Sequence, residues 1–203
     1  MSALSAATVR RARPGRPRHI PETATTKSPR EQILEAAVRL FTGKGFAGTS
    51  TREIADAVGI RQASLYYHFA GKDEILTELL GMTVRPSHDK VDRIIAATPA
   101  EDAEGLATAL YLLALVDIGT LAEVPHNIGM LARMPDVVTA ANGEVFAGFR
   151  LDYREIAAAY ADFGGRLSQV NGLVVSADGL ATMLIQQVEA VITLRTDGVL
   201  GRP

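Results

Sequence analysis

The chain has 203 residues, no cysteine and a formal net charge of −2, and 47% of its residues are hydrophobic. This composition favours a folded protein, and the lack of cysteine excludes disulfides, thiolate nucleophiles and thiolate metal sites. The charge is uneven, because residues 1–72 hold 12 Lys and Arg against 5 Asp and Glu, whereas residues 73–203 hold 9 against 18. Only the basic front is therefore expected to meet a polyanion.

Residues 1–27 are predicted to form a flexible basic arm, because they are rich in Arg and Pro and show no apolar periodicity. A transit peptide is disfavoured, since the prolines would break the amphipathic helix that it needs. Arg13, Arg16 and Arg18, interleaved with Pro and Gly, resemble an AT-hook, which fits the minor groove of A·T-rich DNA. A solvated tail that adds only non-specific affinity is an equally good interpretation.

Two short helices separated by a glycine turn are predicted in the region that follows the first long helix. Ser28 and Ser50 are each followed three residues later by glutamate, which is the capping-box pattern of a helix start. Gly59 supplies the turn, and a third helix is predicted from Gln62 to His68. This order is typical of a helix-turn-helix, whose second helix enters the major groove of DNA.

The rest of the chain is predicted to be entirely helical, because alanine and leucine dominate and β-branched alternation is scarce. The expected helices lie near residues 72–83, 87–97, 101–118, 121–132, 136–164 and 177–197. The longest strongly apolar stretch, Gly105–Val116, is too short to span a bilayer. The fold class expected from the sequence is therefore all-α.

A group of residues between positions 33 and 76 forms a specific pattern. These residues are Ile33-Leu34-Glu35-Ala36-Ala37, Leu40-Phe41, Gly45-Phe46, Thr49-Ser50-Thr51, Ile54-Ala55, Val58-Gly59-Ile60, Leu65-Tyr66-Tyr67-His68-Phe69 and Lys72-Asp73-Glu74-Ile75-Leu76. Together they resemble the N-terminal domain of the TetR family of bacterial transcriptional regulators. Arg61 departs from the pattern, because the family often has Ser or Thr just before the recognition helix; Arg61 either contacts DNA or is solvated. The remaining two-thirds match the family only in length and helical character.

The resemblance implies three parts: a flexible arm over residues 1–27, a helix-turn-helix domain over 28–72, and a helical effector-binding and dimerisation domain over 73–203. It implies a cytoplasmic, sequence-specific transcriptional regulator, most simply a repressor that a small molecule releases from its operator. The alternatives are an architectural DNA-binding protein without a ligand switch, or an activator of the same fold. No sequence motif supports catalysis, a metal site or a cofactor.

The predicted DNA-contacting residues surround the second and third helices. They are Thr49, Ser50, Thr51, Arg52, Arg61, Gln62, Ala63, Ser64, Tyr66, Tyr67, His68 and Lys72, with Arg13, Arg16 and Arg18 of the arm. Gln62 can pair bidentately with an adenine edge, and Ala63 can touch a thymine methyl group. The alternative is that Gln62, Ala63 and Ser64 are ordinary surface residues of a short helix.

The aromatic residues and the lysine that follow allow two interpretations each. By resemblance, Tyr67 and His68 reach phosphates while Tyr66 leans on the domain; alternatively, all three pack the helix against its neighbours. Lys72 stands at a helix N-terminus, where it could share a phosphate with free amide groups, or it could be solvated. For Ser50, helix capping is expected to be the larger role.

The family logic further implies a homodimer and a ligand pocket in the C-terminal part. The predicted dimer face consists of Phe146, Leu180, Met183, Leu184, Gln187, Val188, Val191 and Leu194. The predicted pocket consists of Tyr111, Leu115, His126, Met130, Met134, Phe149, Tyr153 and Gln187. A dimer would read a palindromic operator, with recognition helices about 34–36 Å apart. The apolar character of the pocket indicates a hydrophobic or aromatic effector; the alternative for both sets is a monomer core.

Overall fold

A computed structural model describes residues 27–97, 102–123, 125–140, 143–172 and 175–200 of this chain. Within these residues all regular secondary structure is helical. The elements are α1 (Pro29–Lys44), α2 (Thr51–Val58), α3 (Gln62–His68), α4 (Lys72–Ala97), α5 (Ala103–Glu123), the 3-10 helix η1 (Pro125–Arg133), α6 (Pro135–Ala140), the 3-10 helix η2 (Glu144–Phe146), α7 (Ala147–Asn171) and α8 (Ala177–Thr196). Within these ranges the expected all-α class is confirmed. The arm, with Arg13, Arg16 and Arg18, lies outside the described residues.

The predicted capping boxes start the first two helices. The Ser28 hydroxyl accepts a hydrogen bond from the Glu31 amide, and the Glu31 carboxylate accepts one from the Ser28 amide. Ser50 and Glu53 form the same reciprocal pair before α2. Gly59 ends α2 in a left-handed conformation with φ of 80°, which glycine adopts without steric cost, and this turn leads into α3.

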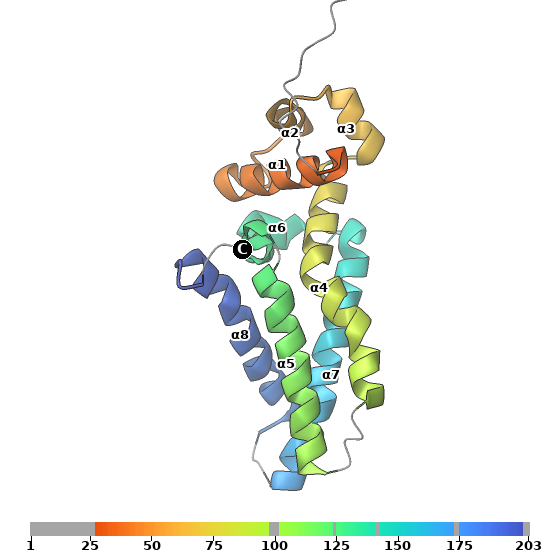
Figure 1. Ribbon diagram of the computed structural model, residues 1–203, viewed down its shortest axis with the longest axis vertical. Helices are drawn as coiled ribbons and strands as arrows, with labels where there is room; N and C mark the ends of the chain where they lie inside the picture. Colours follow the sequence, from red (N-terminus) through yellow and green to blue (C-terminus); the bar gives the residue numbers. More distant parts are fainter. Residues whose placement is uncertain (1–26, 98–101, 124, 141–142, 173–174, 201–203) are drawn as a thin grey trace, which may run out of the picture.

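The long helix α4 runs from the helix-turn-helix at one end of the molecule along the bundle formed with α5, α7 and α8 (Figure 1). The prediction of two helices, 72–83 and 87–97, is therefore wrong, because Pro86 lies inside one continuous helix. Proline removes one helical hydrogen bond. Val84, Ser87 and Val91 are buried on both sides of it, so packing of this face outweighs the local cost.

Two other expected helices have different boundaries in the structure. The helix expected at 121–132 is divided between the end of α5 and η1, which begins at Pro125. The helix expected at 136–164 is divided into α6, η2 and α7, and Gly143 lies at the start of η2. The helix expected at 177–197 is confirmed by α8.

Two hydrophobic clusters hold the fold together. The first joins α1–α3 and the start of α4 to Ile128, Leu131, Val137 and Phe146, which come from η1, α6 and η2. The second lies inside the bundle of α4, α5, α7 and α8. Because both clusters draw on α4, the domain boundary at residue 72 stays a prediction.

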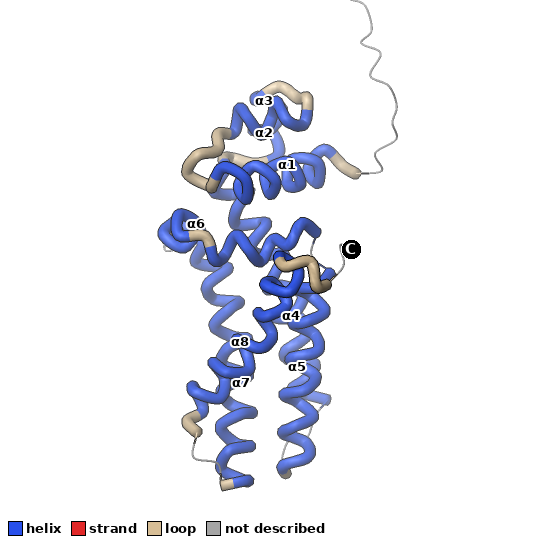
Figure 2. Tube along the Cα trace, turned by 90° about the vertical axis from the view of Figure 1, so that its left-hand side faces the viewer, coloured by secondary structure: helices blue, strands red, loops and turns tan. Residues whose placement is uncertain are grey.

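Helix α5 has 21 residues, and an 18-residue window within it has a mean hydropathy of 1.8. By length and composition alone it could cross a membrane, so the expectation from Gly105–Val116 understated its length. A central helix of a bundle passes the same test, and α5 packs against α4, α7 and α8 (Figure 2). One face of α5 therefore belongs to the second cluster, whereas Tyr111 and Leu115 on the helix stay exposed.

A titratable contact joins α4 to α7, where His88 lies against the Glu155 carboxylate. This hydrogen bond, followed by the charges of Asp152 and Asp89, raises the pKa of His88 above its ordinary value. The contact with Glu155 stabilises the fold fully below the pKa of an unfolded histidine, about 6.5. This stabilisation disappears as the pH rises through the higher pKa of the folded state.

We expect His88→Gln to lower the melting temperature at pH 5.5 but not at pH 8.5. Equal losses at both pH values would contradict this.

Candidate DNA-binding surface and effector pocket

The helix α3 is anchored by one face and presents the other to solvent at the end of the molecule (Figure 1). Leu65 is fully buried and Phe69 nearly so, which fixes the helix on α1, α2 and α4. Gln62, Ala63 and Ser64 are all exposed at its leading end. This arrangement lets the backbone of α3 approach another surface closely, as a recognition helix must.

A small polar network connects the leading end of α3 to the start of α2. The Gln62 amide donates to the Thr51 hydroxyl at 2.9 Å and lies 3.4 Å from the Tyr66 hydroxyl. The Thr51 and Tyr66 hydroxyls are themselves 3.1 Å apart. The network orients Gln62 on the exposed face and holds Tyr66 against α2, in keeping with the expectation that Tyr66 leans on the domain.

Tyr67 is the most exposed of the large apolar residues in the described part of the chain, at 88% of its surface. Its ring meets the neighbouring His68 edge to face, with centroids 5.3 Å apart. Since Tyr67 adds so little to the core, packing does not account for it, and its ring is free to contact a partner. The two neighbouring tyrosines therefore differ: Tyr66 is hydrogen-bonded to Thr51 of α2, whereas Tyr67 points away from the core.

Lys72 and Thr49 hold the turn between α1 and α2. The Lys72 ammonium donates to the Phe46 carbonyl at 2.9 Å and the Thr49 carbonyl at 3.1 Å, and it lies 4.5 Å from the centre of the Phe46 ring. The buried Thr49 hydroxyl donates to the Gly45 carbonyl at 2.8 Å. Lys72 is therefore not simply solvated, and phosphate binding by Lys72 and Thr49 stays a prediction.

Replacing Lys72 with methionine tests which role dominates. If the lysine mainly clamps the turn, the variant should melt at a lower temperature and bind DNA more weakly with an unchanged salt dependence. If it mainly neutralises a phosphate, the slope of log affinity against log salt should fall by about one unit. Fluorescence anisotropy over a salt series, together with thermal melts, separates the two; we expect the clamp result.

Two arginines flank this surface and are exposed. Arg61 precedes α3 and makes no side-chain cap, as its departure from Ser or Thr implies. Arg52 on α2 lies 4.0 Å from Asp56, a pair that is open to solvent on both sides. Both guanidinium groups can therefore turn towards a polyanion at little cost.

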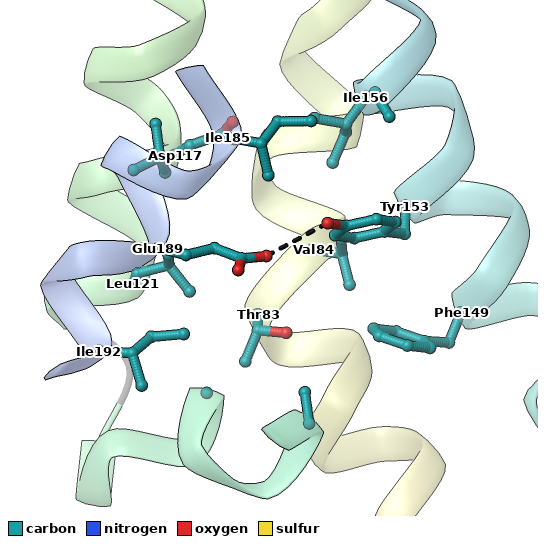
Figure 3. A pocket seen from close by; sticks show the side chains of 14 residues that line it. Thr83, Val84, Asp117, Leu121, Phe149, Tyr153, Ile156, Ile185, Glu189 and Ile192 are labelled. Carbon is teal, nitrogen blue, oxygen red and sulfur yellow. Dashed lines mark hydrogen bonds between the residues drawn. The ribbon is translucent and has the colours of Figure 1, made fainter. Parts of the chain in front are cut away.

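A cavity of about 80 Å³ lies between α4, α5, α7 and α8, with η1 closing one end (Figure 3). Its lining residues are Thr83, Val84, Asp117, Leu121, Gly129, Ala132, Phe149, Tyr153, Ile156, Ala157, Ile185, Val188, Glu189 and Ile192. Most are apolar. The cavity has the character of a small-molecule site, an apolar hollow with a few convergent polar groups.

The two acids and the tyrosine hydroxyl of this pocket come from three different helices, and Thr83 adds a hydroxyl from α4. The Tyr153 hydroxyl on α7 donates to the Glu189 carboxylate on α8 at 3.2 Å, and burial together with Glu189 raises the pKa of Tyr153 to about 12 (Figure 3). The Tyr160 hydroxyl donates to the Asp117 carboxylate on α5 at 2.8 Å. Burial raises the pKa of Asp117, although hydrogen bonds from Ser87 and Tyr160 act against the shift.

Comparison with known proteins relates this chain to one family. Residues 33–79 match the family described as bacterial regulatory proteins, tetR family. The repressor KstR2 of Mycobacterium tuberculosis is 39% identical over 88 residues, which cover 41% of this chain and 43% of KstR2. The crystal structure of Mycobacterium smegmatis AmtR is 34% identical with a TM-score of 0.72, and the match covers 94% of this chain and 83% of AmtR.

The chain belongs to the TetR family. TetR-family proteins are DNA-binding transcriptional regulators and not enzymes, in agreement with the motif analysis. A second solved structure of this fold, AibR in complex with isovaleryl coenzyme A and operator DNA, is 20% identical with a TM-score of 0.57, over 86% of this chain and 98% of AibR. The matches to the curated relatives are shorter, and the match to KstR2 spans less than half of that protein's length.

Only part of the predicted pocket of this TetR-family chain lies at the cavity. Phe149 and Tyr153 line it. The others do not: Tyr111, Leu115 and Gln187 are exposed, Met134 packs against the first hydrophobic cluster, Met130 is not among the lining residues, and the side chain of His126 lies outside the described part. The sequence analysis missed Asp117 and Glu189. The feature that could have identified them is the presence of one acidic residue within an apolar helical stretch.

The predicted dimer face needs a similar correction. Phe146 is buried in the first cluster, and Val188 and Val191 are buried inside the monomer, so these three cannot form an exposed face. Met183, at 60% exposure, and Leu194 remain on the outside of α8, as does Gln187. Leu180 and Leu184 are half-buried. The exposed members of the set stay candidates for a dimer contact.

Proposed function

We propose that this protein is a homodimeric repressor that binds a palindromic operator through α3 and leaves it when a small molecule with a largely apolar body fills the bundle cavity. The observation that carries the proposal is the separation of two sites on one framework. An exposed recognition helix lies at one end of the molecule (Figure 1), and a largely apolar cavity lies between the helices of the bundle. The relative KstR2 is a repressor, and AibR holds both a small molecule and DNA, which supports the same division of labour here.

Two physical connections join the proposed sites. Thr83 and Val84 line the cavity and belong to α4, whose first turns pack against α1–α3. Gly129 and Ala132 line it from η1, and the next helix, α6, contributes Asp136, which accepts a hydrogen bond from the Ala47 amide at 2.9 Å. A ligand that moves α4 or η1 would therefore shift the turn that leads into α2.

The proposed dimer forms through the outer surfaces of α7 and α8, which pack side by side (Figure 2). Met183 and Leu194 on α8, with Leu151 and Val170 on α7, are large apolar side chains exposed in the monomer. Burial of such a surface favours association, and a two-fold dimer presents two recognition helices to successive major grooves.

As a regulator that meets chromosomal DNA, the protein is proposed to act in the cytoplasm.

The experiment that tests DNA reading is selection of duplexes from a random pool by the full chain at physiological salt. An enriched palindrome supports a dimeric sequence reader. Enrichment of A·T-rich DNA without symmetry contradicts it and makes the arm the principal binder, as in an architectural protein. The second candidate function, activation by the same fold, is not favoured by any observation in the described residues.

The ligand-release part of the proposal is tested by filling the cavity. Ala157 lines the pocket on α7, and Ala157→Leu should retain operator binding and lose ligand response. Ala107 is exposed on α5, so Ala107→Leu is the matched control and should respond like the wild type. Release of the Ala157→Leu variant at wild-type ligand concentrations would contradict an effector site in this cavity.

A further inference from the structure

The cavity carries negative charge on an otherwise apolar wall. Asp117 from α5 and Glu189 from α8 both line it, and no Lys, Arg or His is among its described lining residues. Figure 3 shows the Glu189 carboxylate pointing at the Tyr153 hydroxyl, with Phe149 on the same side of the cavity as Tyr153. The two carboxylates therefore define the charge that a ligand meets.

The two carboxylates differ in how they are compensated. Glu189 accepts a hydrogen bond from Tyr153 and lies 3.4 Å from the Arg133 guanidinium, which borders the adjoining outer hollow. Asp117 is paired in the described structure only with neutral hydroxyls, those of Tyr160 and Ser87. Burial without a cation disfavours the ionised form of Asp117, and an organic cation bound beside it would offset that cost by pairing with the carboxylate.

Aromatic faces complete the arrangement. Phe149 and Tyr153 lie one turn apart on α7, with ring centres 6.4 Å apart and planes inclined by 36°. Aromatic faces attract organic cations, and the attraction is stronger where water is excluded. An acid on one wall and aromatic rings on the other match an ammonium group carried by an apolar body.

We infer that the effector is a small organic cation, an apolar amine whose protonated nitrogen pairs with Asp117 and whose hydrocarbon part fills the space between Phe149 and Ile185. This inference rests on the proposed effector site and specifies its ligand class. Organic anions are excluded by the same walls, because a third negative charge beside Asp117 and Glu189 would be repelled in a low-dielectric cavity.

The test uses three probes of equal length, 1-hexylamine, 1-hexanol and hexanoate, with the full chain at pH 7. Calorimetry should show the amine binding at least tenfold more tightly than the alcohol, with no measurable binding of the carboxylate. Asp117→Asn should remove the preference for the amine and leave the affinity for the alcohol unchanged. Asp92 is an exposed acid on α4, so Asp92→Asn is the matched control and should keep the preference.

The outcomes separate this inference from the proposed function. If the alcohol or the carboxylate binds as tightly as the amine, the cation inference is overturned, whereas operator release by either probe would still support the proposed function. If the amine binds preferentially but leaves operator affinity unchanged, ligand release is overturned and the cation inference stands. Circular dichroism and a melting curve show whether Asp117→Asn folds. If it does not, the three probes with the wild-type protein alone decide the preference.

Discussion

Replacing Tyr67 with alanine should weaken operator binding by about ten- to a hundred-fold, the effect of losing one base or backbone contact of about 1–3 kcal/mol. The thermal stability should not change, because the side chain is 88% exposed and contributes little to the core. Fluorescence anisotropy with the selected operator, at one fixed salt concentration, measures the first quantity. A melting curve measures the second.

A tyrosine far from the recognition helix serves as the control. Tyr111 is 65% exposed on α5, in the bundle, so Tyr111→Ala removes the same side chain from a surface that does not face the operator. It should bind the operator like the wild type. Equal losses in both variants, or none in either, would show that Tyr67 is not a DNA contact.

Replacing Asp136 with alanine should uncouple the two sites. Its carboxylate joins α6 to the turn before α2 through the Ala47 amide, across 89 positions of sequence. This bond, the largest influence, holds the pKa of Asp136 below its usual range. Coupled sites typically change each other's affinity by about 5- to 150-fold, and the variant should lose most of that factor while binding operator and ligand separately.

The measurement is operator affinity with and without a saturating amount of whichever six-carbon probe binds the wild type. Asp92→Ala, at an exposed position of α4, is the control and should keep the full response. An undiminished response in Asp136→Ala would leave α4 as the route between the sites. Because the lowered pKa keeps Asp136 ionised at pH values where an ordinary aspartate is already protonated, wild-type coupling should weaken only under strongly acidic conditions.

The helix-turn-helix could be predicted in detail because its signals are local. A serine followed three residues later by glutamate specifies a helix start from the chemistry of four residues, and both capping boxes occur. Gly59 likewise supplies a left-handed turn within its own immediate neighbourhood. Such features do not depend on what the rest of the chain does, so sequence alone is sufficient for them.

The boundaries of the bundle could not be predicted in the same way. Pro86 locally disfavours a helix interior, yet the buried face around it packs against other helices and keeps α4 continuous. The information that decides this case lies in the partner helices, far away in sequence. The same applies to Phe146, which looks like a dimer residue in sequence and is buried against the helix-turn-helix core.

The pocket was the least predictable part, because its lining comes from four α-helices and η1. Phe149 and Tyr153 could be found as aromatic residues at helical spacing. Asp117 and Glu189 could not, since a single acid on a helix is usually solvated, and only the packing of α5 against α7 and α8 shows that these acids meet a cavity. The charge of a pocket is thus a property of helix packing.

The position of α8 as the last described helix also has a consequence for biosynthesis. The core beneath α1–α3 needs residues no later than Phe146, whereas the bundle needs α8, which packs on α5, α7 and η1. At roughly 5–20 residues per second, a growing chain completes the first core seconds before the second. A chain that stalled before α8 would keep its recognition helix. It would lack Ile185, Glu189 and Ile192 from the cavity wall and would therefore not respond to the effector.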